Sequence, residues 1–225
     1  MGFRYEMHCH TNAFSACGKS TPEEMVRKFK DLGYTGLFIT EHFAESCILY
    51  HKNVPWEEYI NTLYSTYERA KTEGDKCGLD VFFGLEYPAG GWAHFLVYGL
   101  TKEYLLANDY LLDIPPHEFL RNVRAEGAFV VHAHPFRKAS NDLVRLYPDL
   151  THAVETLNAS RTDDVNLRAD GYAEMMNLPK MAGSDIHHCG QEKLGCIVAE
   201  RKIKDEKDLF ELVKSGKYHI ETVMG

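Results

Sequence analysis

The sequence lacks the features that mark membrane, secreted and disulfide-stabilised proteins. No window approaches the roughly 18 apolar residues of a membrane span, and the first twenty residues are too polar for a signal-peptide core. The six cysteines are few for 225 residues, and none forms a CxxC pair. We therefore expect reduced thiols in a cytoplasmic protein without a membrane partner.

The sequence also lacks a run of lysine and arginine, and its formal net charge is −8. A protein that covers nucleic acid broadly needs a basic face, so we expect no extended nucleic-acid surface. A phosphorylated substrate stays compatible with this charge because bound divalent ions would reverse the sign of the local field. The acidic balance and the twelve histidines favour metal cations and a small phosphorylated substrate as partners.

Apolar strand patterns alternate with helical patterns along the whole chain. Strands are predicted near residues 3–7, 36–40, 81–85, 94–98, 128–131, 153–157 and 180–183, and helices near 20–32, 56–72, 117–126 and 163–177. Such alternation is typical of βαβ units and a parallel sheet. Seven units without a linker predict one α/β domain over residues 1–225, built as a closed or nearly closed barrel. A strand over 196–199 and a helix over 205–215 follow, and the first strand is expected to bury one face only.

Side chains that can bind metal stand at the ends of these predicted strands. His8 and His10 leave the first strand on one side, and an isolated acid, Glu86, ends the third. In a barrel the active site lies at the C-terminal strand ends, so these side chains should meet. Imidazole and carboxylate ligands suit zinc, manganese or iron, and Glu86 is the natural bridge between two ions. Paired ions would activate water at neutral pH. The other strand ends carry His42, His134, Asn158, Asp185 and His187.

Six short motifs together resemble the PHP (polymerase and histidinol phosphatase) family of metal-dependent phosphoesterases. They are His8-Cys9-His10-Thr11, Ile39-Thr40-Glu41-His42, Gly84-Leu85-Glu86, His94 before Phe-Leu-Val-Tyr-Gly, Ala133-His134-Pro135 and Gly183-Ser184-Asp185-Ile186-His187. The resemblance covers essentially the whole chain. It implies a distorted (β/α)7 TIM-like barrel that holds two or three divalent metal ions at its strand ends.

The resemblance also implies how the ligands divide among three metals. One ion would bind His8, His10, Glu86 and Asp185; a second Glu86, His94 and His134; and a third His42 and His187. Where the family supplies a further His or Asp ligand, this chain has Ala16, and the neighbouring Cys17 is a candidate thiolate ligand or a packed residue. Glu41 replaces the family's usual Asp, and we expect it to orient a ligand through a hydrogen bond.

A phosphoesterase also needs positive groups and a place for its substrate. Arg137 is the best candidate to bind a phosphate, and Arg161 is the next, with a surface salt bridge as the alternative for each and the favoured one for Arg161. His132 is expected to support a ligand or pack in the core, and His188 to line the substrate pocket or the surface. Specificity should depend on the loops 44–55, 90–93 and 136–150, where Tyr50 and Trp92 could stack on a ring.

The leading hypothesis is a phosphatase that hydrolyses a small phosphomonoester, similar to histidinol phosphate or a nucleotide, by metal-activated water. A proton for the leaving group would come from His187 or His42. One alternative is a metal-dependent amidohydrolase, although that family usually bridges its metals through a carboxylated Lys and here Glu86 follows the strand. Another is a metal-binding regulatory module without activity. The sequence leaves the metal, the oligomeric state and the physiological substrate open.

Overall fold

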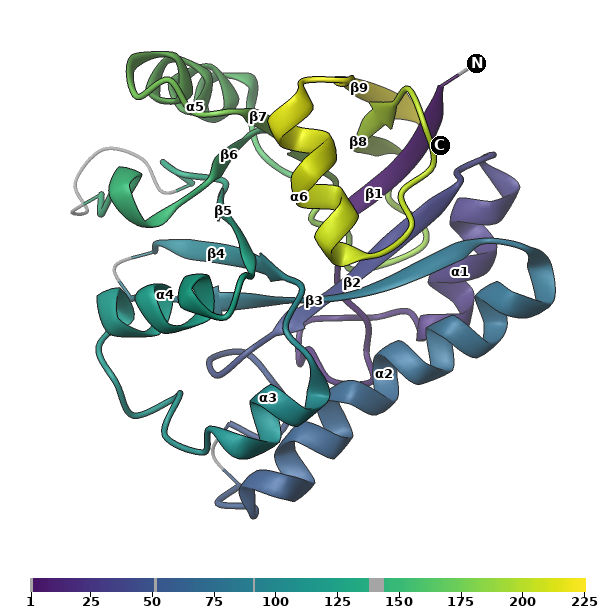
Figure 1. The fold of residues 1–225 in the computed structure, drawn as a ribbon. Coiled ribbons are helices and arrows are strands. Elements are labelled where there is room, and N and C mark those ends of the chain that lie inside the picture. The colour runs from purple at the N-terminus through teal and green to yellow at the C-terminus, as the bar shows by residue number, and fades with distance from the viewer. Residues whose placement is uncertain (1, 51, 91, 138–143) are drawn as a thin grey trace.

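The computed structural model describes residues 2–50, 52–90, 92–137 and 144–225. Within these residues, nine strands form one sheet in the order β7-β6-β5-β4-β3-β2-β1-β8-β9 (Figure 1). The strands are β1 (Phe3–Cys9), β2 (Gly36–His42), β3 (Asp80–Pro88), β4 (His94–Tyr98), β5 (Phe129–Ala133), β6 (Ala153–Asn158), β7 (Lys180–Gly183), β8 (Lys193–Ala199) and β9 (Tyr218–Met224). The helices are α1 (Pro22–Asp31), α2 (Trp56–Cys77), α3 (Lys102–Ala107), α4 (Pro116–Ala125), α5 (Asp163–Met175) and α6 (Glu206–Ser215), with a 3-10 turn η1 (Pro148–Leu150).

The sheet curls until the segment after β7 reaches β1. His10 N donates to Ile186 O at 2.9 Å, and Ile186 N donates to His8 O at 3.1 Å. Cys9 and Ile186 thereby form a parallel bridge that nearly closes the ring. The predicted α/β barrel is confirmed, and β8 and β9 extend the sheet beyond β1.

Strand β4 departs from the predicted all-parallel arrangement. It pairs antiparallel with both β3 and β5. Only residues 89–93 join it to β3, too few for the crossover that a parallel strand needs. Its N-terminal end therefore lies beside the C-terminal ends of β3 and β5, which brings His94 next to Glu86 and His134.

Strand β1 is buried on both faces, so the prediction of one buried face is wrong. Both Tyr5 and Met7 on one side and Glu6 and His8 on the other are buried. Glu6 tolerates burial because its carboxylate accepts hydrogen bonds from the backbone N–H groups of His8 and Ser184. The central position of β1, between β2 and β8, explains its double burial.

The apolar core of the described residues consists of several clusters, two of which pack helices α1, α2, α3 and α4 against the sheet. Tyr5, Met7, Phe38 and Tyr98 form one cluster with side chains of α6, such as Leu209. Helices α1 and α2 pack side by side outside β2 and β3 (Figure 1). Helix α2 continues to Cys77, five residues past the predicted end, because Gly78 supplies the left-handed C-cap. Among the described residues no helix is long and apolar enough to cross a membrane, and a cytoplasmic location stays a prediction.

Candidate metal centre

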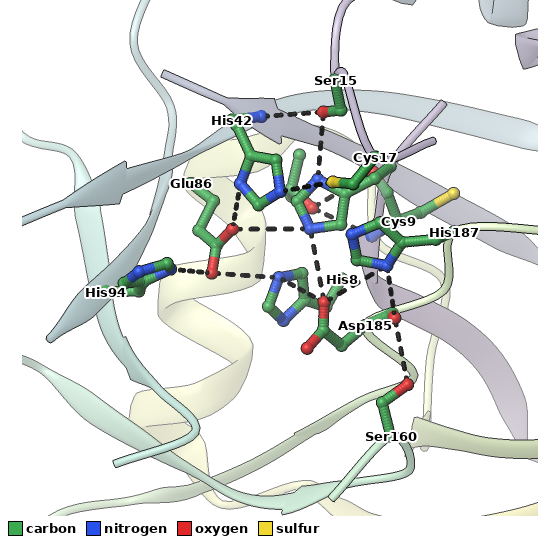
Figure 2. A network of polar contacts seen from close by, with 12 residues as sticks. His8, Cys9, Ser15, Cys17, His42, Glu86, His94, Ser160, Asp185 and His187 are labelled. Atoms are coloured by element: carbon green, nitrogen blue, oxygen red, sulfur yellow. Dashed lines mark hydrogen bonds and ion pairs between the residues drawn. The ribbon is translucent and has the colours of Figure 1, made fainter. Parts of the chain in front are cut away.

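The fold brings all eight predicted metal ligands to one end of the barrel. They come from the C-terminal ends of β1, β2 and β3, the start of β4, and the segments after β5 and β7. Figure 2 shows His8, His42, His94, Asp185 and His187 gathered around Glu86. Within the described residues, four groups of three side chains place one possible ligand atom each within 4.8 Å of the others. These groups are His8/His10/Asp185, Glu86/His94/His134, His10/His42/His187 and His8/His134/Glu155.

Glu86 lies at the centre and faces histidines with both oxygens. Oε1 is 2.7 Å from His94 Nδ1 and 3.0 Å from His134 Nε2. Oε2 is 2.6 Å from His42 Nδ1 and 3.5 Å from His10 Nε2. The carboxylate is buried, yet the surrounding imidazoles, His94 foremost, hold its pKa well below the usual value. An ionised carboxylate whose two oxygens face different histidines is able to bridge two cations, and the bridging role of Glu86 stays a prediction.

His8 is oriented by a carboxylate that the sequence reading missed. Its Nδ1 is 2.9 Å from Glu155 Oε1, and because a carboxylate only accepts, Nδ1 must donate. In the neutral ring Nε2 then carries no proton, and it faces Glu86 Oε1 at 3.5 Å and Asp185 Oδ1 at 3.6 Å. Glu155 also accepts from His134 N at 2.9 Å and from Asn158 Nδ2 at 2.9 Å. Burial disfavours a charged His8, but neighbouring carboxylates, Glu155 foremost, raise its pKa well above the usual value.

His10 is held in the same way through Ser15 and Glu41. Ser15 Oγ contacts His10 Nδ1 at 3.3 Å and accepts from His42 N at 3.1 Å. Glu41 in turn accepts hydrogen bonds from Ser15 and Thr11, as expected of a residue that orients a ligand. Ser15 was not predicted from the sequence because a lone serine in a loop carries no pattern.

Asp185 completes the ligand set and is fixed from several sides. Arg161 Nη2 donates to its Oδ2 at 2.7 Å, and Ser160 Oγ donates to its backbone oxygen at 3.1 Å. Arg161 thus forms the salt bridge that was the alternative to substrate binding, and a contact between Arg161 and substrate stays a prediction. Asp185 has a left-handed backbone with φ of 51°, and so has His134 with φ of 28°. Strained backbone in non-glycine residues is concentrated at functional sites.

His42, His187 and Cys17 form the outer part of the centre. Cys17 Sγ is 3.2 Å from His42 Nε2, and His187 Nδ1 donates to the Asp185 backbone oxygen at 2.9 Å. Burial raises the pKa of the Cys17 thiol, but its hydrogen bonds with His187 and His42 lower it to about 6. Burial opposes a charged His42, but Glu86 and Cys17 raise its pKa to about 10.

The unpartnered atoms of the centre match what bound cations would need. His8 Nε2 and His10 Nε2 are buried without a hydrogen-bond partner, and Glu86 Oε2 makes no well-aligned hydrogen bond although it lies 2.6 Å from His42 Nδ1. The Nε2 atoms of His8 and His10 lie 3.6 Å and 3.5 Å from Asp185 Oδ1. Two ligand atoms about 2.1 Å from one tetrahedral zinc ion would be roughly 3.4 Å apart. Buried polar atoms of native proteins are normally paired, so the donor set fits divalent metal ions.

The remaining predicted site residues lie at different distances from this centre. Arg137 Nη1 is 3.3 Å from His94 Nδ1, at the rim. His132 is buried, and its ring stacks on Phe95 with centroids 4.7 Å apart, which favours the core alternative. Burial lowers the pKa of His132 to about 3. His188 is exposed.

Comparison with protein-family models now identifies the family. The model of the PHP domain matches residues 6–147, and that of the PHP-associated domain matches residues 164–218. The chain therefore belongs to the PHP domain family, a family of metal-dependent hydrolases. Strands of both matched segments share one sheet, and a single domain over residues 1–225 stays a prediction. No curated protein matches the sequence.

Several solved structures share the fold. One is a two-domain protein from Bacteroides vulgatus that contains a predicted PHP-like metal-dependent phosphoesterase. Its sequence is 17% identical, and the TM-score is 0.73. The match covers 98% of this chain and 65% of that protein. The present chain thus spans about two thirds of that relative. An amidohydrolase from Chromobacterium violaceum is 13% identical, with a TM-score of 0.56. The match covers 83% of this chain and 88% of the amidohydrolase. A third is endonuclease Q in complex with a 27-mer duplex that has an abasic lesion; it is 13% identical, with a TM-score of 0.62. The match covers 96% of this chain and 57% of the endonuclease.

The endonuclease corrects one expectation from the sequence. A small phosphorylated substrate and no nucleic-acid surface were expected from the acidic charge, but a structure of this fold holds duplex DNA at its active site. Net charge is a poor guide here because it counts only the protein's own groups. Bound divalent ions would place positive charge where a phosphate lies, whatever the sign of the rest of the surface.

Proposed function

We propose that this protein is a metal-dependent phosphoester hydrolase whose substrates carry a nucleobase. The proposal rests on Glu86, whose two oxygens face separate groups of histidines. Nearby, the Nε2 atoms of His8 and His10 are buried without a hydrogen-bond partner. His8, His10, Glu86 and Asp185 would hold one ion, and Glu86, His94 and His134 a second. Such ions, when bound, supply Lewis-acid stabilisation of phosphoryl oxygens and activate water.

The chain's own groups would then hold the phosphoester in place. The Arg137 guanidinium lies against the His94 ring, with Nη1 3.3 Å and 3.4 Å from its two nitrogens. This position suits two parallel hydrogen bonds to phosphate oxygens at the rim of the centre. Arg161 donates to Asp185 and would keep that carboxylate in place. Burial alone would raise the pKa of Asp185, but His8, His10 and His134 keep it well below the usual value.

A cavity of about 280 Å³ adjoins His94 and offers a place for the organic part of the ester. Trp92 and Arg137 line it, and the guanidinium carbon is 5.6 Å from the centroid of the Trp92 ring. The volume is close to the lower end of small-molecule sites, roughly 300 Å³. A tryptophan with 46% of its surface exposed can stack on one base, and the fold is shared with an enzyme complexed with DNA. Residues 51, 91 and 138–143 of the predicted specificity loops lie outside the described residues.

Turnover of matched phosphodiesters tests this proposal. With zinc or manganese added, the p-nitrophenyl ester of thymidine monophosphate should be hydrolysed faster than methyl p-nitrophenyl phosphate, which has the same leaving group without a base. Stacking of one base contributes about 1–3 kcal/mol, so Trp92→Ala should lower kcat/KM for the thymidine ester by roughly fivefold to 150-fold. The kcat/KM for the methyl ester should change little, because that ester has no base to stack.

Two further arms decide between the alternatives. Tyr110→Ala removes an aromatic ring of similar exposure, 42%, outside this cavity and should leave both rates unchanged. p-Nitrophenyl phosphate and p-nitroacetanilide should be run in parallel to test for phosphatase and amidohydrolase activity. Turnover of the anilide alone would contradict the proposal and favour the amidohydrolase alternative.

A further inference from the structure

We infer that Cys17 is a thiolate ligand that makes the outer metal position selective for soft divalent ions. The inference deepens the metal-dependent function proposed above. Cys17 stands next to Ala16, where the resemblance to the family leads one to expect a His or Asp ligand. Figure 2 shows the Cys17 side chain pointing toward His42 beside His187.

The loop that carries Cys17 is held rigidly in this place. Ala16 N donates to Ser46 O at 2.7 Å, Gly18 N to Ser15 O at 3.0 Å, and Lys19 N to His187 O at 2.7 Å. A Cβ atom on Gly18 would lie 2.2 Å from Thr11 O, so only glycine lets the loop pass this close to β1. The thiol is thus fixed by backbone contacts on both sides and does not reach the centre by chance.

Several donor atoms converge at this position. Cys17 Sγ is 3.2 Å from His42 Nε2, close to the roughly 3.6 Å expected between a sulfur and a nitrogen ligand of one tetrahedral zinc ion. His187 lies beside Cys17 (Figure 2), and its Nδ1 is occupied by the Asp185 backbone oxygen. His10 Nε2, buried and unpartnered, belongs to the same ligand group as His42 and His187. These nitrogens make Cys17 part of a site and not an isolated thiol.

The donor set determines which ions the position would take. A thiolate with two imidazoles favours zinc or cobalt over manganese and magnesium, which prefer oxygen ligands. A Cys17→Asp substitution should reverse this preference, because it replaces the soft thiolate with a hard carboxylate oxygen. The outer position should therefore bind zinc in the natural protein and manganese in the Asp variant.

Cobalt substitution tests the inference without any need for turnover. Titration of the metal-free full chain with Co²⁺ should produce a thiolate-to-cobalt charge-transfer band in the near ultraviolet. Cys17→Ser should abolish the band and lower the bound cobalt by one equivalent, and Cys17→Asp should abolish the band while retaining that equivalent. Cys77→Ser is the matched control, because Cys77 is a partly buried thiol on α2 that donates to the backbone oxygen of Gly74 and packs against an apolar cluster.

The outcomes separate the inference from the proposed function. Cobalt bound without a charge-transfer band, or a band that survives in Cys17→Ser, would overturn the role of Cys17 even if phosphoester turnover is high. A band that is lost only in the Cys17 variants would support it even if no phosphoester is hydrolysed. Circular dichroism of each variant checks that the fold is retained.

Discussion

Glu86→Gln is expected to lower phosphoester turnover by roughly two to three orders of magnitude, the loss seen when one preorganised charge-stabilising group is removed. Glutamine has nearly the same shape but replaces one carboxylate oxygen with an N–H donor. That donor would face His42 or His94, whose Nδ1 atoms lie 2.6 Å and 2.7 Å from the carboxylate. The variant would therefore lose both the negative charge and the bridge between the two ions.

Metal content and turnover should be measured on the same sample of this variant. We expect at least one fewer equivalent of bound metal, and excess zinc or manganese should not restore the rate. Glu57→Gln makes the same chemical change on the exposed surface of α2 and should leave both quantities unchanged. A Glu86→Gln protein with full metal content and full activity would remove Glu86 from the mechanism.

Glu155→Gln is expected to weaken metal binding by about tenfold to a hundredfold, as is usual when the group that orients a ligand is lost. The glutamine side chain has one accepting oxygen and one donating NH2 group, so it cannot accept hydrogen bonds from both His8 Nδ1 and His134 N. His8 would therefore lose its fixed orientation. Competition with a chromophoric chelator measures the affinity. In contrast to Glu86→Gln, high metal concentration should restore most of the turnover, because every proposed ligand is still present.

The outcome of this experiment distinguishes orientation from structural support. An unchanged metal affinity with a lower Tm would mean that Glu155 only stabilises the barrel. Packing favours the orienting role: a Cβ atom on Gly183 would lie 2.5 Å from Glu155 Oε1 and 2.6 Å from His8 Cβ. The glycine of the Gly183-Ser184-Asp185 motif thus leaves room for the His8–Glu155 pair.

The general form of the centre could be predicted because apolar strands end abruptly in polar residues. A barrel gathers such ends, so the spacing of His8, His42, Glu86 and His134 along the chain was enough to expect them together. Their assignment to individual metals came from the family resemblance and stays a prediction.

Other features could not be predicted from sequence because they depend on tertiary contacts. Glu155 lies inside β6 instead of at its end, where an acid normally indicates a solvated face, yet it is buried against His8. The direction of β4 depends on the short connection 89–93, which the repeating strand–helix pattern concealed. Arg161 follows a strand end in the same way as Arg137 does, but it pairs with Asp185.

The most direct test of this account is elemental analysis of the purified protein, paired with hydrolysis of the thymidine p-nitrophenyl ester before and after chelation. We expect two or three equivalents of zinc, manganese or iron per chain. Turnover should be lost when the metal is chelated and should recover when metal is added back. A protein without bound metal that also fails to take up zinc, manganese or iron would contradict the metal centre formed by His8, His10 and Glu86.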